Sequence, residues 1–340
     1  MGLNEKFFKS ASDTPFINTD NFNTVLYPGN NTTSRNITGV GFNPDMVWVK
    51  NRDISGENHS IGDTVRGGGK IVYPNLTLGE NGFEYITPSG VADGFTITTN
   101  NNNILNNKYV AWCWKAGGAE VSGTSSHYTN CEISANPDAG FSIVNFTVPS
   151  GTIPTTASYN HGLNAPPKLI ITKPYNGYFG ASSWYTWAEP ITTSNYLLLN
   201  TSDTSAAGAI FSSVDSSTVK YRFASNNGGA DSDVITYNFT DVVGYQKVGS
   251  YTGELAPKFV QTDFAPRFVL IKRTDSSVAF WLIYDSVRGA SLQLTPTTDG
   301  AEYDWGASPQ IQFNSNGFTL TTNNAYLNGV GGQFIYLAIA

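Results

Sequence analysis

Three short runs of apolar residues, each preceded by a proline and followed by a lysine, form the most regular pattern along the chain. They occupy residues 44–50, 167–173 and 266–272, so the proline and the lysine are six residues apart in every copy. Because proline fixes φ and donates no backbone hydrogen bond, it suits the first residue of a strand. We predict that each run is the central strand of a module that occurs three times, and that its lysine marks the place where the strand returns to water.

Between these runs, polar and apolar residues alternate over short stretches that are separated by Gly, Asn and Pro. Such alternation with frequent turn residues is typical of short strands in a β-sandwich or barrel. No segment repeats apolar residues at the i, i+3, i+4, i+7 spacing of an amphipathic helix, so helices should be few and short. The pattern therefore predicts an all-β fold of three tandem antiparallel β-sandwich modules, jelly-roll-like, with little helix.

Two further motifs recur at fixed distances from the first and third runs. The pattern Asp-x-Val-Arg-Gly is found at residues 63–67 and 285–289, in each case beginning 19 residues after the proline of its module. Residues 94–100 recur with one substitution as residues 317–323. Modules one and three are therefore copies of one another, whereas module two lacks the Asp-x-Val-Arg-Gly pattern. We place an N-terminal arm at residues 1–20, which is either frayed or docked on a larger assembly. The three modules follow at residues 21–118, 119–245 and 246–340.

Some apolar runs are continuous and do not alternate. They lie at residues 46–49, 268–271 and 334–339. An antiparallel strand with one face in water should alternate between apolar and polar residues. A continuous run indicates that both faces are covered, by another sheet, another module or another subunit. We therefore expect a homo-oligomer or a subunit bound to a larger particle.

Composition narrows the choice of partners. Charged residues make up 13% of the 340 residues, about half of the ~25% usual for soluble domains, and 13% aromatic residues indicate an ordered chain. The net charge is −7 without a basic run, which argues against nucleic acid as a partner. No stretch approaches the ~20 apolar residues of a membrane-spanning helix, so we expect no membrane insertion. We see no secretory signal and expect synthesis in the cytoplasm.

The two cysteines, Cys113 and Cys131, form no CxxC pair. Cys113 lies in a strand-like apolar run, where a free thiol acts as a small core residue. We expect two inert thiols, but the sequence leaves open whether they pair with each other.

No catalytic site is recognisable in the sequence. The three histidines, His59, His127 and His161, stand in no known nucleophile motif, and scattered Ser, His and Asp residues do not define a triad. His161 should lie in the turn before the second proline–lysine run. We predict that the protein is not an enzyme and needs no cofactor.

Two groups of neighbouring acidic residues are the remaining candidates for chemistry. They are Asp299, Glu302 and Asp304, and Asp231 with Asp233. Carboxylates at short range suit glycoside hydrolysis or a Ca²⁺-binding loop, but this spacing is also common in ordinary loops. We interpret them as solvated loop carboxylates and predict no metal site.

The repeated Asp-x-Val-Arg-Gly pattern places Asp63 three residues before Arg66 and Asp285 three residues before Arg288. Such an arginine could clamp a ligand, or it could close a tight turn by binding the aspartate or nearby carbonyls. Since both modules keep the motif at the same distance from the strand, we favour the structural role.

The strongest ligand candidate is a group of aromatic and amide residues in module two. It comprises Tyr175, Asn176, Tyr178, Phe179, Trp184 and Trp187. Aromatic faces stack on sugar rings, and an asparagine can bind hydroxyl groups, so these residues suit a glycan or protein ligand. The tryptophans align with the strand-like residues 280–284 of module three, so core packing is the competing interpretation. The loop at residues 175–179 is the part that core packing does not explain.

Several segments resemble one known family. Residues 42–52, 109–118, 244–253 and 268–273 are similar to a repeated β-rich module of tailed-bacteriophage structural proteins. That module is common in phages of marine and cyanobacterial hosts, where it is usually labelled tail fibre or tail protein. The resemblance covers nearly the whole chain after residue 20, is strongest in modules one and three, and supplies no catalytic residues.

The resemblance implies a structural protein at the virion surface, made in the host cytoplasm. We expect a tail fibre or tail-associated protein that binds other virion proteins and contacts a glycan or protein of the host surface. The alternative is a capsid decoration or head-fibre protein. A glycan depolymerase is a third class, and it would need a carboxylate pair that the sequence does not reveal.

Overall fold

The computed structural model describes residues 20–82, 86–98, 102–222 and 230–340, and antiparallel strands dominate this part of the chain. The predicted all-β, sandwich-type fold with little helix is confirmed. Among the described residues, no helix is long and apolar enough to cross a membrane. The predicted N-terminal arm, except its last residue, lies outside the described residues.

The first module is a β-sandwich. Its strands are β1 (Phe22–Pro28), β2 (Arg35–Thr38), β3 (Met46–Asn51), β4 (Ser60–Asp63), β5 (Ile71–Val72), β6 (Ile86–Val91), β7 (Gly94–Ile97) and β8 (Lys108–Trp114). They form a five-stranded sheet in the order β1-β8-β3-β4-β5 and a three-stranded sheet in the order β2-β7-β6. Val47 of the larger sheet and Phe95 of the smaller one share one apolar core, so the two sheets pack face to face.

The second module repeats this plan with additional strands. Its elements are β9 (Val121–Ser122), β10 (Thr129–Asn136), β11 (Phe141–Val148), β12 (Ser158–Asn160), β13 (Leu169–Pro174), the 3-10 turn η2 (Gly177–Phe179), β14 (Tyr185–Ala188), β15 (Asn195–Leu198), β16 (Ala206–Ala207), β17 (Phe211–Val214), β18 (Thr218–Tyr221) and β19 (Ser232–Phe239). The larger sheet has eight strands in the order β16-β15-β14-β13-β19-β11-β10-β9, and the smaller has the order β12-β18-β17. Tyr159 and Phe146 stack between the sheets with ring centroids 5.0 Å apart.

The third module has the plan of the first. Its strands are β20 (Gln246–Thr252), β21 (Lys258–Gln261), β22 (Phe268–Arg273), β23 (Trp281–Asp285), β24 (Leu292–Gln293), β25 (Tyr303–Asp304), β26 (Ile311–Asn314), β27 (Gly317–Leu320) and β28 (Gln333–Ile339). A four-stranded sheet in the order β20-β28-β22-β23 faces a three-stranded sheet in the order β21-β27-β26, and β24 pairs with β25. Phe318 and Tyr336 pack edge to face between the sheets, 5.4 Å apart.

The strands that follow the repeated prolines, β3, β13 and β22, lie inside the larger sheets. Each begins two residues after its proline, so the proline precedes the strand and does not open it. Each also pairs with the last strand of its module, β8, β19 or β28. The predicted central strand of the repeat is therefore confirmed, with its start shifted by two residues.

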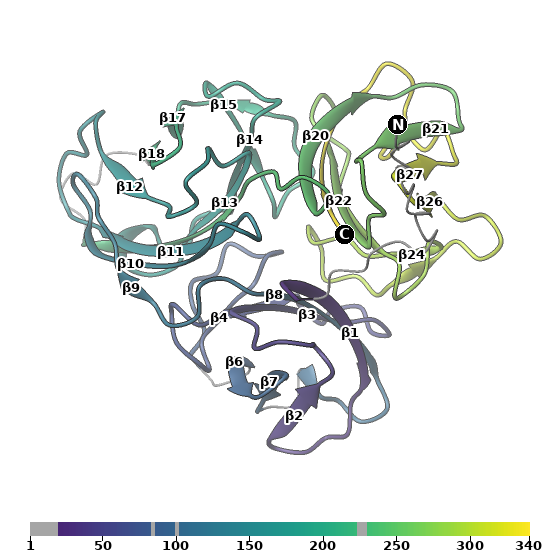
Figure 1. Cartoon of the computed structure of the whole chain (residues 1–340), viewed down its shortest axis with the longest axis horizontal. Coiled ribbons are helices and arrows are strands. Elements are labelled where there is room, and N and C mark those ends of the chain that lie inside the picture. The colour runs from purple at the N-terminus through teal and green to yellow at the C-terminus, as the bar shows by residue number, and fades with distance from the viewer. Residues whose placement is uncertain (1–19, 83–85, 99–101, 223–229) are drawn as a thin grey trace, which may run out of the picture.

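The three modules form three lobes around a common centre, with the larger sheets turned inward and the smaller sheets outward (Figure 1). Strand β3 has apolar side chains on both faces of its sheet. Val47 and Val49 belong to the core of the first sandwich, whereas Met46 and Trp48 belong to a second core that all three modules share. The alternation of a strand therefore sends successive apolar residues into two different cores.

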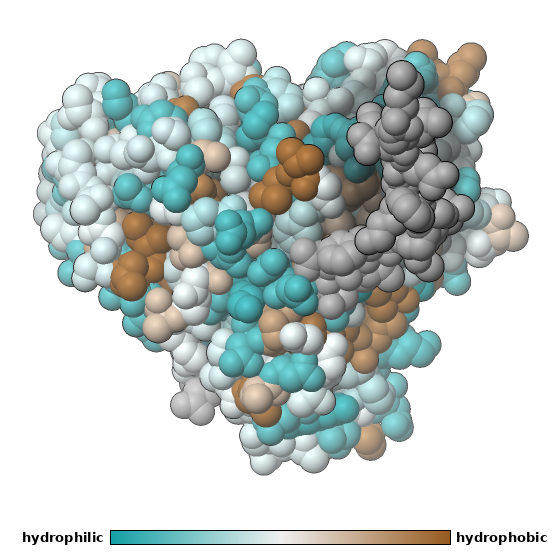
Figure 2. Space-filling model, in the orientation of Figure 1, coloured by the Kyte–Doolittle hydropathy of each residue, from teal (hydrophilic) through white to brown (hydrophobic). Residues whose placement is uncertain are grey.

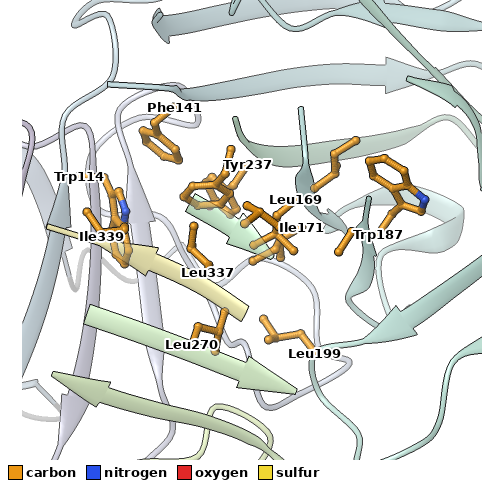
Figure 3. Close-up of a cluster of buried hydrophobic side chains, with 14 of the residues drawn as sticks. Trp114, Phe141, Leu169, Ile171, Trp187, Leu199, Tyr237, Leu270, Leu337 and Ile339 are labelled. Carbon is orange, nitrogen blue, oxygen red and sulfur yellow. The ribbon is translucent and has the colours of Figure 1, made fainter. Parts of the chain in front are cut away.

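The shared core lies where the modules meet. Trp114, Tyr237 and Leu337, one from each module, lie within it in Figure 3. A void of about 10 Å³ remains at the centre, and its lining is apolar. That volume is at the lower limit for a single water molecule, so the modules pack on one another as closely as the layers of one domain.

The continuous apolar runs are thereby explained. The prediction that they are covered on both faces is confirmed, and the cover is another module of the same chain. The predicted homo-oligomer loses this argument and stays a prediction. On the face seen in Figure 2, apolar residues lie in small groups among polar ones.

Candidate functional site

The lysines that end the three repeated runs are buried, so the prediction that they mark a return to water is wrong. Lys50, Lys173 and Lys272 each have 0% exposure. Nζ of each lysine donates to two main-chain carbonyl oxygens, which replace water as its partners. The bonds tie the modules together.

Each lysine donates one bond within its module and one to a neighbouring module. The acceptors within the module, in the order of the lysines, are the carbonyl oxygens of Glu57, Ser182 and Ala279. The acceptors in the neighbour are the carbonyl oxygens of Asp299, Thr77 and Ser202, at 3.2, 2.9 and 3.1 Å. Module one thus binds module three, module two binds module one, and module three binds module two. The three bonds close a ring.

Burial makes the charged form of these lysines costly. It lowers the pKa of Lys50 and of Lys272 to about 8, and that of Lys173 to about 7. An amine with a pKa near neutrality can act as a nucleophile or a base. Because all three side chains are fully buried, no substrate reaches them, and the arrangement supports a structural role.

A second ring of side chains accompanies the lysines. His59, Trp184 and Trp281 each lie two residues beyond the carbonyl that their own module offers to its lysine. Each approaches a main-chain carbonyl of the neighbouring module through a ring nitrogen. The acceptors are the oxygens of Thr295, Tyr73 and Leu198, at 3.2, 2.8 and 2.9 Å. The sequence suggested core packing for Trp184, and the structure adds this bond between modules.

His59 is fixed in one neutral form. Trp48 donates its indole N–H to Nδ1 of His59 at 3.0 Å, so the imidazole proton lies on Nε2 and points to the carbonyl oxygen of Thr295. Burial, with the charge of Lys50 nearby, lowers the pKa of His59 well below its usual value. A neutral, fully buried imidazole with both nitrogens engaged is a structural group.

The structural role favoured for Asp63 and Arg66 is confirmed. Nε of Arg66 donates to Asp63 Oδ2 at 2.6 Å, and another nitrogen of its guanidinium donates to the carbonyl oxygen of Ile61 at 3.1 Å. The backbone N–H of Arg66 also donates to Asp63 Oδ1 at 2.8 Å, which closes the turn. Arg288, Asp285 and Ile283 repeat the same contacts.

Each of these pairs has a third member that sequence reasoning missed. Arg66 also binds Glu80 at 3.2 Å, and Arg288 binds Glu302 at 2.8 Å. The glutamate follows its arginine by 14 residues in both modules (80 − 66 and 302 − 288), and this equal spacing is the signal that could have revealed it.

The acidic groups were interpreted as solvated loop carboxylates, and this is wrong for Glu302, whose side chain is only 9% exposed. Glu302 binds Arg52 of module one as well as Arg288, with one oxygen 2.6 Å from the Arg52 guanidinium. Asp304 accepts from the backbone of Gly306. Asp231 and Asp233 accept from the Ser150 backbone and the Thr147 hydroxyl. Within the described residues, no group of three or more His, Cys, Asp or Glu side chains could hold a metal ion.

His161 lies in the connection before β13, as expected. Its Nδ1 accepts from the backbone of Leu163 at 3.2 Å, and its Nε2 lies 3.0 Å from the carbonyl oxygen of Asp215. Burial lowers its pKa, which keeps it neutral. His127 packs edge to face against Tyr128 with ring centroids 6.0 Å apart. Neither histidine has a serine, cysteine or carboxylate side chain as a hydrogen-bond partner among the described residues.

The structure separates the six candidate ligand residues of module two into two sets. Trp184 and Trp187 are core residues, with 0% and 5% exposure. Tyr175 is also buried and donates its hydroxyl to Asn145 at 2.9 Å, while the Arg66 guanidinium lies 5.6 Å from its ring. These three side chains are therefore part of the scaffold.

The remaining three residues form the loop around η2. Asn176 accepts from the backbone of Gly177 and donates to Asp233 at 3.1 Å, so its amide is used within the loop. Phe179 is partly buried against the core, and Tyr178 packs edge-on against it with ring centroids 4.8 Å apart. Tyr178 is 60% exposed. It is the member of the group best placed to meet a partner.

Both cysteines are free. Cys113 is fully buried, and burial raises the pKa of its thiol. Burial and the charge of Glu132 raise the pKa of Cys131 to about 11. Because the thiolate is the reactive form, both thiols should be inert at neutral pH, as the sequence suggested.

Residues 18–340 match a family described as a domain of unknown function, DUF7483. The comparisons with curated proteins and with solved structures give no match. The family match spans all three modules, so the closed ring corresponds to one family unit. The chain belongs to the DUF7483 family.

Proposed function

We propose that this protein is a non-enzymatic structural protein of a bacteriophage virion, a tail fibre or tail-associated protein that contacts the host surface. The observation that carries this proposal is the use of charged groups. The three repeated lysines, both Asp-Arg-Glu clusters and His59 are buried or engaged at the contacts within and between modules. Side chains of the kinds that enzymes use for catalysis make structural contacts here.

Rigidity suits a particle component. A ring of three sandwiches with one shared core and interlocked polar contacts should resist shear better than three modules joined only by linkers, because no module can turn without breaking buried bonds. The exposed loops then remain to contact a partner. The exposed Tyr178, supported by Phe179, is a contact of the kind that multiple copies on one particle would multiply into firm attachment.

A second candidate is a capsid decoration or head-fibre protein. The compact, three-lobed body favours it, because a fibre is elongated whereas this chain forms a closed triangle (Figure 1). A protein of this shape can cover a patch of a shell.

Antibody labelling of purified virions, viewed by electron microscopy, tests the proposal. Label on the tail supports the tail role, label on the head supports the decoration role, and absence of label from intact virions contradicts both. Addition of the purified protein before infection should reduce adsorption if the tail protein contacts the host. Loss of cell-surface polysaccharide on incubation with the protein would instead indicate a depolymerase.

A further inference from the structure

Module one contains a small polar pocket that the proposed function does not use. Its volume is about 150 Å³, and its wall includes Glu57, Asn58, Ser60, Tyr73 and Asn102. This is room for several waters or one small polar molecule. Glu57 and Asn58 are only half-buried, so the pocket opens to solvent on their side.

One wall of the pocket carries an unsatisfied amide. Asn102 is 3% exposed, and its Nδ2 is buried without a hydrogen-bond acceptor. The hydroxyl of Tyr27 donates to the carbonyl oxygen of Asn102 at 3.1 Å, which fixes the backbone at this point. Buried donors are nearly always paired in native proteins, so this donor on a pocket wall needs an acceptor, which a ligand or a water molecule in the pocket can supply.

Glu57 supplies a hydrogen-bond acceptor to the same pocket. Among the described residues, no side chain or backbone group donates a hydrogen bond to its carboxylate. Burial raises its pKa, and the charge of Lys50 opposes that rise. The backbone carbonyl of Glu57 accepts from Lys50, which holds the backbone of Glu57 in place beside the pocket. The pocket therefore presents an acceptor as well as an unpaired donor.

Module three shows what the same place looks like when it is filled. The lysine bonds make Glu57 equivalent to Ala279. The strand registers make Ser60, opposite Val49, equivalent to Leu282, opposite Ile271.

The tyrosine bonds extend this equivalence. Tyr27 donates to the carbonyl of Asn102 as Tyr251 donates to that of Leu327, so these two acceptors are equivalent as well. Asn58, one residue after Glu57, has Phe280 as its counterpart.

The two copies differ at these positions in one consistent way. In module three the counterparts are apolar, and Leu282 and Leu327 are fully or almost fully buried. In module one they are Ser60 and Asn102, which are shorter or polar. A packed apolar plug in one copy is thus an open polar pocket in the other. The fold itself does not require an opening at this place. Module one has an opening because smaller or polar residues stand where module three has leucines.

The chemistry of the wall selects the ligand. The Glu57 carboxylate disfavours an anion, and a single carboxylate is too few for a divalent metal. The amides and the hydroxyl disfavour an apolar molecule. A simple cation would satisfy Glu57 but leave the Asn102 donor unpaired. A hydroxyl group satisfies both, because it can donate to the carboxylate while its oxygen accepts from the amide.

We propose that this pocket binds one neutral, hydroxyl-rich ligand, a single sugar residue, between Glu57 and Asn102. The surface of the wall is almost entirely polar, which suits a ligand that carries several hydroxyl groups. Such binding would be a property of the chain itself and would not depend on where the chain is attached to a virion. It is also separate from the Tyr178 loop of module two.

The test uses the full chain and three probes, glucose, galactose and mannose, each titrated separately. The readout is the NMR signal of the Asn102 side-chain amide, which is assigned by its loss in the Asn102→Leu variant. At least one sugar should shift this signal saturably, with a dissociation constant in the millimolar range expected for so small a ligand. Ser60→Leu, which introduces the residue of module three, should weaken binding by about tenfold or more.

Two further variants keep the test sharp. Glu57→Gln keeps the size of the side chain but removes its charge, and should weaken binding by about tenfold. Gln312→Leu, an exposed amide on β26 of module three, is the matched control and should leave binding unchanged. Saturation-transfer signals from the sugar give an independent readout in the variants that lack the Asn102 signal. Each variant is used only if its unfolding midpoint shows that it is folded.

Three results would overturn the proposal. The first is the absence of a saturable shift with all three sugars in the wild-type chain. The second is unchanged sugar binding in both Ser60→Leu and Asn102→Leu. The third is a shift produced by ammonium chloride but by none of the sugars, which would make the pocket a cation site.

Discussion

Tyr237 of module two donates its hydroxyl to Asp63 of module one at 2.8 Å, inside the shared core. The same oxygen of Asp63 accepts from Arg66 at 2.6 Å. The aspartate of a turn in one module is therefore the acceptor for a strand of the next. Through this contact, the Asp-x-Val-Arg-Gly motif of module one also helps to hold module two in the ring.

The contact has a counterpart at the interface of modules three and one, where Trp112 donates its indole N–H to Asp285 at 3.0 Å. The strand registers place Trp112, Tyr237 and Leu337 at one equivalent position, two residues beyond the partners of the three lysines. Module two has Ala188 where the others have aspartate, and module three has Leu337 where the others have a donor. The acceptor and the donor are thus both absent at the third interface, so neither of these two positions holds an unpaired polar group.

The first prediction concerns this bond. Tyr237→Phe should lower the free energy of unfolding by about 1.5–3 kcal/mol, because it removes a buried hydrogen bond to a charged group. Urea unfolding followed by tryptophan fluorescence measures the change. Tyr178→Phe makes the same substitution at an exposed site and should stay within about 0.5 kcal/mol of the wild type. Equal losses in the two variants would contradict the role assigned to Tyr237.

The second prediction concerns the pKa of Lys173. Burial lowers this pKa to about 7 in the folded chain, from 10.5 in the unfolded one, so the unfolded state binds more protons between these two values. Stability should therefore rise with pH from about 7 to 9, by at most ~1.4 kcal/mol per pH unit for this group. Above pH 10 the buried tyrosines act in the opposite direction, because their raised pKa values keep them neutral while unfolded tyrosines ionise.

The slope can be assigned to the lysine with one variant. Lys173→Met keeps the length of the side chain but does not titrate, so its stability should rise less with pH over the same window. Urea midpoints at pH 7, 8 and 9 give both slopes. Parallel slopes for the variant and the wild type would show that Lys173 is not responsible.

Sequence reasoning succeeded where a pattern depends on local physics. Strand β3 was predicted because its apolar run and its proline are local, and the turn of Asp63 and Arg66 was predicted because the motif recurs at a fixed distance from that strand. The continuous apolar runs correctly indicated a second cover. Each of these inferences needs only a short segment of the sequence and, for the turn, the comparison of its two copies.

It failed where a distant segment decides. Lysine is rarely buried, so Lys50 was expected at a strand end in water. Its second acceptor, the carbonyl oxygen of Asp299, lies 249 positions further along the chain, and no pattern in the sequence predicts this contact. The polar pocket of module one was missed for a related reason, because the contrast of Ser60 with Leu282 has meaning only after the two copies are aligned through their registers.

The third prediction uses a difference between the copies. Trp48 and His59 of module one stand where module three has Leu270 and Trp281, so the larger side chain has changed places. His59→Trp alone should destabilise the fold by about 1–3 kcal/mol, because two indoles would compete for one space. The double variant Trp48→Leu, His59→Trp should recover part of that loss.

A double-mutant cycle measures the recovery as a coupling energy. For side chains in contact, a coupling of about 0.5–3 kcal/mol is expected. The same cycle between His59→Trp and Gln312→Leu should be additive, because the first residue is buried in module one and the second is exposed on module three. Additivity in the Trp48 and His59 cycle would show that the two positions are not exchangeable between modules.

The fourth prediction concerns acid. Burial lowers the pKa of His59 well below 6.5, so the unfolded chain binds a proton there as the pH falls through 6.5 while the folded chain does not. The contribution of His59 is therefore complete above pH 6.5 and is lost progressively below it. A proton on Nδ1 would also face the indole N–H of Trp48, which now donates to that nitrogen.

The variant His59→Gln isolates this effect. Its side-chain oxygen can accept from Trp48 and its amide can donate to the carbonyl of Thr295, but it does not titrate. Between pH 7 and 5 the wild type should lose more stability than the variant, while His161 and Asp45 titrate alike in both chains. Urea unfolding at three pH values in this range measures the difference. If both chains lost stability in parallel, the acid sensitivity of the ring would have to come from groups other than His59.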